Sequence, residues 1–410
     1  MNKLLTSALV LGLSGVSFAA GRSAAPGLGA LRMPLPAEIN QIAVPMPPAP
    51  QSTRWWSVDF FGSAHKAIMR AALGFVDGRE FSDIARARDL LLPGANDETG
   101  HILKTDNGGP VKEIWLGNTP FSKGGVLWNY EHLKFIEAYS RLGTLCHLTQ
   151  DQAVPAHAAN ISHYTNEGFE GYAGDGNKVR ISAARDGGEM EPYAYYQDLQ
   201  DDTRRHLAGW KNPATGVPYW EPAPDAPRLG QDATYGPPGH YGGGRDTYVF
   251  MEQNNGDGGS GNQQVTASPE IRARQLAMAG AATVAVLEAA SRRLPPLVQN
   301  LAVTVQGRAV SVGFTALDNR SRSVKYSVSL YRDGAPAGDL LPGEAALKEP
   351  SVPGLPLSAV VSEKLDLSSL PAGKYTLAVG LKDGDGNVTP AEVNSDEIAQ
   401  NDTVAQLTLN

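Results

Sequence analysis

Three histidines and one aspartate lie close together in a chain that has only eight histidines among its 410 residues. His147, Asp151 and His157 belong to the segment HLTQDQAVPAH, and His163 follows soon after it. Side chains four residues apart share one face of a helix, so an imidazole nitrogen of His147 and a carboxylate oxygen of Asp151 can reach the same cation. We expect Pro155 to end this helix and to turn His157 back toward the same pocket.

The ligand types indicate which metal such a site would hold. Imidazole nitrogen and carboxylate oxygen without a thiolate suit Zn²⁺ in a hydrolytic site, because zinc has no redox chemistry and lowers the pKa of a bound water molecule. A histidine four residues from an aspartate is by itself most often a surface pair, and the addition of His157 and His163 is what favours the metal. The single cysteine, Cys146, is expected to be a buried apolar residue of the same helix.

The charge of the chain limits the classes of partner. Its formal net charge is -8 and no run of Lys and Arg occurs, which argues against a nucleic-acid coat protein and against an anchor on anionic membranes. A composition of 41% hydrophobic and 19% charged residues is ordinary for a globular protein with a core of its own. A bound cation would supply the local positive charge that the sequence lacks.

The histidine segment carries a recognisable set of residues: His147, Asp151, Pro155, His157, Ala158, Ala159 and Asn160. This set resembles the metal motif of the zinc-dependent bacterial phospholipases C, a helical family that shares its fold with the fungal single-strand nucleases. The resemblance extends from about Trp55 to about Leu294. It implies three zinc ions, held by an N-terminal tryptophan, five histidines and acidic residues.

The resemblance assigns ligands residue by residue. Trp55 would offer its amino group and carbonyl to one zinc, which His65 also binds, and this requires Trp55 to be the mature N-terminus. Asp151 would bridge this zinc to a second one, held by His147 and His101. The two metals would therefore share one carboxylate.

The acidic ligands of the remaining positions stay open. Asp97 or Glu98, both in GANDETGH, would complete the second site, and the one that does is expected to double as the base that orients the attacking water. The third zinc would take ligands that follow the motif: His157, His163 and either Glu167 or Glu170. Glu170 is preferred of these two, because GFEGY is similar to the family's aromatic-Glu-x-aromatic ending.

Helices are expected to carry most of these residues. Helical patterns occur in five segments, at residues 64–75, 81–92, 130–147, 192–210 and 268–294. A tract rich in Gly, Pro, Asn and Asp at residues 211–263 reads as a large loop between the last two segments. The first three hundred residues are therefore expected to be mostly helical.

After Pro295 the pattern changes to short segments rich in valine and tyrosine, separated by turns. Seven or so strands in about 110 residues favour an immunoglobulin-like sandwich. Within it, Asp383, Asp385 and Asn387 hint at calcium, but DGDGN is more typical of a hairpin turn. The expected fold class is thus multidomain, with a mainly α-helical zinc-binding catalytic domain at 55–297 followed by an all-β immunoglobulin-like sandwich at 298–410.

The start of the chain has the features of an exported protein. Residues 1–20 combine Lys3, an apolar run and small residues, which is typical of a secretory signal peptide. Residues 21–54 read as a propeptide or linker, and Arg54 is a plausible processing site. We expect a secreted protein, extracellular or periplasmic, without an internal disulfide because the chain has one cysteine.

Together these features predict a secreted zinc-dependent phosphodiester hydrolase that holds two to three zinc ions. Phospholipase C is preferred over a nuclease because nine residues separate Trp55 from His65, whereas the nucleases hold these two residues much closer. The expected partner is a phospholipid substrate rather than a nucleic acid, with peripheral membrane contact and a monomeric chain. The alternatives are a single-strand nuclease of the same fold and a non-catalytic surface protein that keeps the zinc bundle as a scaffold.

Overall fold

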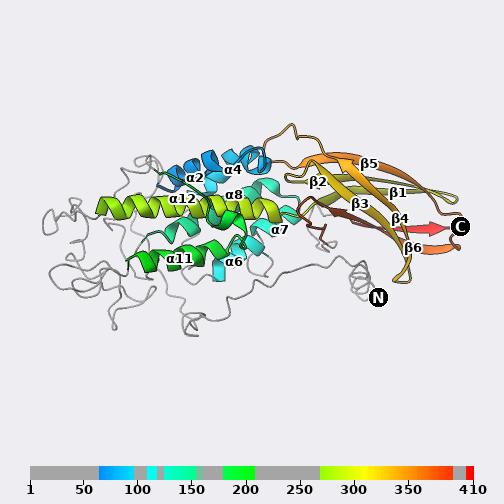
Figure 1. Ribbon diagram of the computed structural model, residues 1–410. Helices are drawn as coiled ribbons and strands as arrows, with labels where there is room; N and C mark the ends of the chain where they lie inside the picture. Colours follow the sequence, from blue (N-terminus) through cyan, green and yellow to red (C-terminus); the bar gives the residue numbers. More distant parts are fainter. Residues whose placement is uncertain are drawn as a thin grey trace, which may run out of the picture. The chain divides into compact units, whose positions relative to one another are not determined.

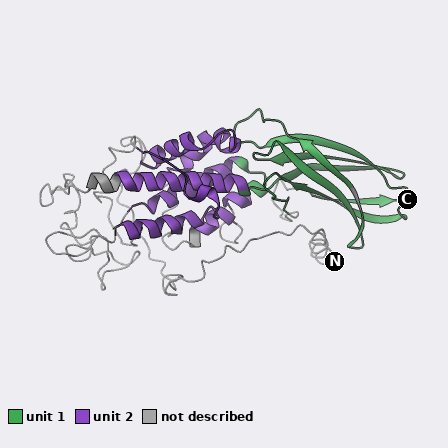
Figure 2. Ribbon diagram, viewed as in Figure 1, with its two compact units in different colours: residues 1–36, 130–135, 293–410 green, residues 37–129, 136–292 purple. Residues whose placement is uncertain are grey.

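The computed structural model describes two compact units (Figure 1; Figure 2). One contains residues 130–135 and 293–410 and is called the strand unit, and the other contains the remaining described residues and is called the helical unit. The residues that the structure describes are 64–96, 109–117, 124–154, 158, 179–207, 268–390 and 403–410.

The helices of the described residues lie before Leu294. They are α2 (Ala64–Phe75), α3 (Ser82–Arg86), α4 (Arg88–Gly94), α6 (Gly109–Leu116), α7 (Val126–Glu131), α8 (Phe135–Asp151), the 3₁₀ turn η4 (Asp186–Gly188), α11 (Ala194–Leu207) and α12 (Ser268–Arg293). Three of the predicted segments, at 64–75, 192–210 and 268–294, correspond to α2, α11 and α12. The predicted helix at 81–92 is divided at Ala87 into α3 and α4.

The helix that carries His147 starts later than the sequence indicates, and it ends between His147 and Pro155. Leu133 has a φ of 61°, a left-handed conformation that a right-handed helix cannot continue through, so α7 and α8 are separate. α8 then runs from Phe135 to Asp151, one turn beyond His147. His147 and Asp151 therefore lie on one helix, at the spacing that places them on the same face.

The long helix α12 packs against other helices of the helical unit. Ile68 of α2, Leu199 of α11 and Ala282 of α12 belong to one buried apolar cluster. Ala279 of α12 is also in this cluster, and such small side chains allow neighbouring helices to approach closely. α2, which carries His65, is thus held in place from its apolar face.

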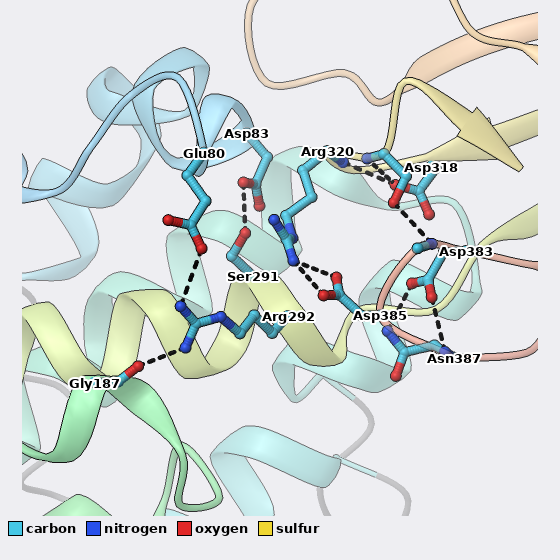
Figure 3. A network of polar contacts seen from close by, with 12 residues as sticks. Glu80, Asp83, Gly187, Ser291, Arg292, Asp318, Arg320, Asp383, Asp385 and Asn387 are labelled. Carbon is cyan, nitrogen blue, oxygen red and sulfur yellow. Dashed lines mark hydrogen bonds and ion pairs between the residues drawn. The ribbon is translucent and has the colours of Figure 1, made fainter.

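A buried carboxylate ties three helices of this unit together, and Figure 3 shows its contact with Ser291. Asp83 of α3 accepts a hydrogen bond of 2.6 Å from the Ser291 hydroxyl of α12 and one of 3.1 Å from the Tyr139 hydroxyl of α8. Because Asp83 is 1% exposed, both hydroxyl donors are needed to offset the cost of removing the carboxylate from water. The contact fixes the N-terminal half of α8 relative to α12.

Two glycines bring the backbones of α4 and α8 into direct contact. A Cβ atom added to Gly143 would meet the Leu91 carbonyl oxygen at 2.3 Å and the Gly94 Cα at 2.9 Å. One added to Gly94 would meet the Ser140 carbonyl oxygen at 2.0 Å. Since real Cβ atoms do not approach backbone so closely, only glycine permits this crossing, which places Ala95 beside the turn of α8 that carries His147.

The strands of the described residues follow the helices in sequence. They are β1 (Leu297–Gln306), β2 (Ala309–Asp318), β3 (Ser323–Arg332), β4 (Ala335–Ala346), β5 (Leu357–Asp366), β6 (Gly373–Lys382) and β7 (Val404–Leu409). They form two antiparallel sheets, with strand orders β1-β2-β5 and β4-β3-β6-β7. Side chains from both sheets join in one apolar core, including Phe314 of β2 and Leu377 of β6.

Two tyrosines of this core also donate hydrogen bonds through their hydroxyl groups. The Tyr375 hydroxyl donates a hydrogen bond of 2.9 Å to the carbonyl oxygen of Pro371, four residues earlier, and so fixes the turn into β6. Tyr326 of β3 packs edge-to-face on Phe314 of the other sheet, and its hydroxyl donates to Glu363 of β5. The two sheets are therefore joined by polar as well as apolar contacts.

The fold class expected from the sequence is wrong. Helices hold 41% and strands 30% of the described residues, so this part of the chain is mixed α and β rather than mainly helical with a β appendage. Residues 130–135 also cluster with the strand unit although they lie among the helices in sequence. Helical periodicity reports only local spacing, and it predicts neither this clustering nor the share of the structure that the two sheets take.

Several expected features lie outside the described residues. These are the signal peptide at 1–20, the propeptide or linker at 21–54 and the loop at 211–263, which all stay predictions. Among the helices that are described, none is both long enough and apolar enough to cross a membrane.

Candidate metal centre

Three of the predicted ligands come together in the helical unit. His65 from α2 and His147 and Asp151 from α8 are all buried, and one ligand atom from each lies within 4.8 Å of the other two. Within the described ranges, no second group of three such side chains is brought together. This buried group could hold a metal ion.

The carboxylate of Asp151 faces both imidazoles, one with each oxygen. Its Oδ1 lies 3.4 Å from His65 Nε2, and its Oδ2 lies 3.6 Å from His147 Nε2. These separations exceed those of ordinary N–H···O hydrogen bonds, which are about 2.7–3.2 Å. Two ligands of a tetrahedral zinc ion, each about 2.0–2.1 Å from the metal, are about 3.3 Å apart. The distances thus resemble the edges of metal coordination shells.

A backbone carbonyl orients His147. Its Nδ1 lies 3.1 Å from the carbonyl oxygen of Ala95. A carbonyl oxygen only accepts hydrogen bonds, so Nδ1 carries the hydrogen and, in the neutral ring, Nε2 presents a lone pair toward Asp151. The Gly94–Gly143 crossing places Ala95 within reach, and a histidine whose second nitrogen donates to a carbonyl is the usual arrangement of a metal ligand.

The side chain of Gln150 orients His65 in the same way. Its Nδ1 lies 2.9 Å from Gln150 Oε1, and Gln150 Nε2 lies 3.1 Å from the Thr283 hydroxyl of α12. Thr283 in turn donates a hydrogen bond of 2.8 Å to the carbonyl oxygen of Ala279. All three side chains are buried, so His65 is held from α8 and α12 as well as from its own helix.

Immediately after Asp151 the backbone hydrogen bonds change to the three-residue spacing of a 3₁₀ turn. Gln152, Ala153 and Val154 donate backbone hydrogen bonds to residues three positions earlier, at 3.1, 2.9 and 2.8 Å. α8 therefore ends at Asp151, four residues before Pro155, rather than at the proline itself. The Gln275 amide of α12 donates to the Ala153 carbonyl at 2.7 Å, which holds this turn against the helical unit.

The other predicted site residues lie outside the described residues: Trp55, Asp97, Glu98, His101, His157, His163, Glu167 and Glu170. The choices between Asp97 and Glu98 and between Glu167 and Glu170 therefore stay open. Of the predicted ligands, His65, His147 and Asp151 lie within the described residues, and they form the buried group that could hold a metal ion.

The cysteine beside His147 takes no part in this group. Cys146 is fully buried, as the sequence predicts, and burial raises the pKa of its thiol. A thiol that stays protonated is a poor metal ligand. In the strand unit, the DGDGN segment contains a turn, as the sequence favours: both oxygens of Asp383 accept hydrogen bonds from Asn387, and Asp385 pairs with Arg320 (Figure 3).

Sequence reasoning missed the residues that orient the ligands. Gln150 is adjacent to Asp151 in HLTQD, but its partner Thr283 is far away in the chain. Ala95 acts through its backbone carbonyl oxygen, which every residue has, so its residue type does not indicate this role. The Gly94 and Gly143 pair could have been noticed as glycines inside helical segments, which usually have a packing reason.

No protein-family model matches the chain, and a search of curated proteins finds no significant match. The resemblance to the zinc-dependent phospholipases C therefore stays a prediction from the motif residues.

Proposed function

We propose that this chain is a zinc-dependent phosphodiester hydrolase that acts as a phospholipase C. One observation carries the proposal, namely that each oxygen of the buried Asp151 carboxylate faces the Nε2 atom of a different histidine. With both rings neutral, the Nδ1 contacts of His65 and His147 place the ring hydrogens away from Asp151, so the lone pairs of both Nε2 atoms face its carboxylate. A cation relieves this arrangement, and a carboxylate between two imidazoles suits a pair of metals.

The chemistry of the donors supports zinc. Two imidazoles and one carboxylate without a thiolate are typical of hydrolytic zinc sites. Bound zinc would polarise a phosphoryl oxygen and lower the pKa of a nearby water molecule, which is the chemistry that phosphodiester hydrolysis requires. The 3.4 and 3.6 Å distances from the Asp151 oxygens to the two Nε2 atoms are close to the spacing of about 3.3 Å between two ligands of a tetrahedral zinc ion.

The protein's own residues would then have defined tasks. His65 and Asp151 would hold one zinc and His147 and Asp151 the other, with Trp55 and His101 as further ligands by the resemblance. Burial of the three described side chains keeps bulk water away from them, which strengthens their electrostatic attraction for a bound cation. The predicted base, Asp97 or Glu98, would orient the attacking water.

Phospholipid is the preferred substrate class. The Trp55-to-His65 spacing resembles the phospholipases rather than the nucleases, and a chain with a net charge of -8 lacks the basic grooves that single-stranded nucleic acids normally require. Secretion, peripheral membrane contact and a monomeric state are parts of the same proposal. The single-strand nuclease and the non-catalytic scaffold are its competitors.

The test is a side-by-side assay of the full chain with excess zinc. Release of diacylglycerol from phosphatidylcholine and phosphatidylethanolamine is measured beside cleavage of single-stranded DNA. We expect diacylglycerol release that a chelator abolishes and that zinc restores. The Asp151→Asn variant should be inactive, whereas Asp77→Asn, which alters an exposed carboxylate at the end of α2, should retain wild-type turnover.

Each of the other outcomes would either favour one of the alternative functions or overturn the proposal. Faster turnover of DNA than of either lipid would make the protein a nuclease. Zinc binding without activity on any of the three substrates would favour the scaffold. An active protein without bound metal would overturn the proposal as a whole.

A further inference from the structure

Gln150 occupies the position immediately before Asp151 on α8, and its side chain lies between two helices. It is 1% exposed, contacts His65 Nδ1 through its Oε1 at 2.9 Å and contacts the Thr283 hydroxyl through its Nε2 at 3.1 Å. A buried glutamine is costly unless its amide is satisfied at both ends. Here both ends have a partner, one of which is a candidate metal ligand.

The direction of the amide is determined by Thr283 rather than by the histidine. The Thr283 hydroxyl uses its hydrogen for the Ala279 carbonyl at 2.8 Å, so it can only accept from its other neighbour. Gln150 must therefore point its NH₂ group at Thr283 and its carbonyl oxygen at His65. The carbonyl oxygen then requires a hydrogen on His65 Nδ1.

We propose that Gln150 and Thr283 are positioning residues for metal binding, because together they set the tautomer of His65 that directs its Nε2 lone pair toward Asp151. This inference rests on the metal-binding part of the proposed function and not on the reaction or the substrate. The hydrogen-bond order runs from the Ala279 carbonyl through Thr283 and Gln150 to His65 Nδ1, and His65 Nε2 is left 3.4 Å from Asp151 Oδ1.

The two histidines of the group differ in how they are oriented. His147 donates to the Ala95 backbone, which a side-chain substitution does not remove. His65 depends on two side chains, so its tautomer can be changed by substitution. If the amide of Gln150 reversed, its NH₂ group would face His65 Nδ1 and favour the ring hydrogen on Nε2, where it would block a metal ion.

Four variants of the full-length protein separate this role from a role in packing. Gln150→Leu removes the acceptor for Nδ1–H, and we expect zinc affinity to fall about 10–100-fold, the usual effect of losing such a partner. Gln150→Glu keeps an acceptor oxygen beside Nδ1 and adds negative charge, so its zinc affinity should equal or exceed the wild-type value. Thr283→Val removes the acceptor that orients the Gln150 amide and should weaken zinc binding. Thr283→Ser keeps the hydroxyl and should bind zinc like the wild type.

The measurement is the zinc dissociation constant, obtained by competition with a chromophoric chelator. Gln200→Leu is the matched control, since it removes a buried glutamine of α11 that accepts a hydrogen bond from Gln197. It should bind zinc like the wild type. Equal affinity of Gln150→Leu and wild type, or equal loss in Gln150→Leu and Gln200→Leu, would overturn the inference.

A spectroscopic readout reports the tautomer directly. In metal-free protein labelled with ¹⁵N-histidine, the His65 signal should show the hydrogen on Nδ1 in the wild type and in Thr283→Ser. It should shift toward the Nε2–H form in Thr283→Val. An unchanged tautomer in both Thr283→Val and Gln150→Leu would show that these residues do not set it.

The design separates this inference from the proposed function. Asp151→Asn is measured in the same competition assay. If Asp151→Asn binds zinc as tightly as the wild type, the proposed metal centre itself is wrong. If Asp151→Asn loses zinc but Gln150→Leu and Thr283→Val do not, the centre stands and only the positioning role fails.

Discussion

The imidazole rings of His65 and His147 stack with their centroids 4.0 Å apart and their planes at 29°. The two rings come from different helices, His65 from α2 and His147 from α8. In the neutral state each ring directs its Nε2 atom toward one oxygen of Asp151. The stack thus joins two helices beside a carboxylate that belongs to the candidate metal-binding group.

Asp151→Asn should lower the free energy of unfolding of the helical unit only when metal is bound. With zinc bound, loss of the shared negative charge should lower stability and metal content together. Without metal, the amide nitrogen of asparagine can donate to one facing Nε2 atom, so stability should be unchanged or higher. Chemical denaturation measures the free energy of unfolding of the metal-loaded and of the metal-free protein, with Asp77→Asn as the control. Equal effects of Asp151→Asn in the two states would contradict a metal between these side chains.

Removal of metal should expose Cys146. This residue is the single cysteine of the chain and is fully buried, and burial raises the pKa of its thiol, so it should react with a thiol reagent only when the helical unit opens. A ligand that binds the folded state alone suppresses opening. The rate of labelling should therefore rise when a chelator is added and stay low when the chelator is saturated with zinc beforehand. A rate that does not respond to the chelator would show that metal does not stabilise this unit.

Gly143→Ala should destabilise the helical unit and weaken zinc binding. The added methyl group would meet the Leu91 carbonyl oxygen at 2.3 Å, so α4 and α8 must separate and the Ala95 carbonyl must move away from His147 Nδ1. Overpacking of this kind costs about 1–3 kcal/mol. Gly74→Ala is the matched control, because this exposed glycine of α2 has nothing within 4 Å of an added Cβ.

For the control, removal of glycine flexibility should raise stability by about 0.4–1 kcal/mol without changing zinc affinity. Thermal unfolding and the zinc dissociation constant measure the two effects. If Gly143→Ala behaved like Gly74→Ala, close contact between the two helices would not be what positions the Ala95 carbonyl.

The strand unit should lose stability as the pH rises from about 4 to about 7. Asp318 is fully buried, and this burial raises its pKa to about 7 from 3.8, with the Asp383 charge acting in the same direction and backbone hydrogen bonds from Arg320 and Ser321 opposing it (Figure 3). Over that pH range the folded state keeps a proton that the unfolded chain has released. The unfolding free energy therefore falls with rising pH and levels off above about 7.

Asp318→Asn should reduce this pH dependence, and the part that remains belongs to Glu131 and Asp383 of the same unit, whose pKa values burial also raises. Asparagine can still accept the two backbone hydrogen bonds through its carbonyl oxygen but carries no charge, so above pH 7 the variant should be more stable, by up to a few kcal/mol at about 1.4 kcal/mol per pKa unit. Asp366→Asn, an exposed aspartate that also accepts a backbone hydrogen bond two residues on, is the control. Urea denaturation between pH 4 and pH 8 gives the comparison. An unchanged dependence of the unfolding free energy on pH in Asp318→Asn would assign the titration to another group.

The local part of the candidate site could be predicted from the sequence alone. The four-residue spacing of His147 and Asp151 requires only that the segment be helical, and a period of 3.6 residues then places both side chains on one face. The helix that begins next to His65 and the long helix from Ser268 to Arg293 were predictable in the same way, because amphipathic spacing and end signals are local properties.

Only the tertiary structure decided which distant residues meet. His65 reaches Asp151, and Thr283 reaches Gln150, because helices pack where small residues allow it, and no periodicity within one helix encodes the neighbour. The strand β4, with the sequence APAGDLLPGEAA, has the composition of a loop, yet it pairs along β3. At Gly343 the ring of Tyr326 lies where a Cβ would be, so tertiary packing outweighs the weak local strand preference there.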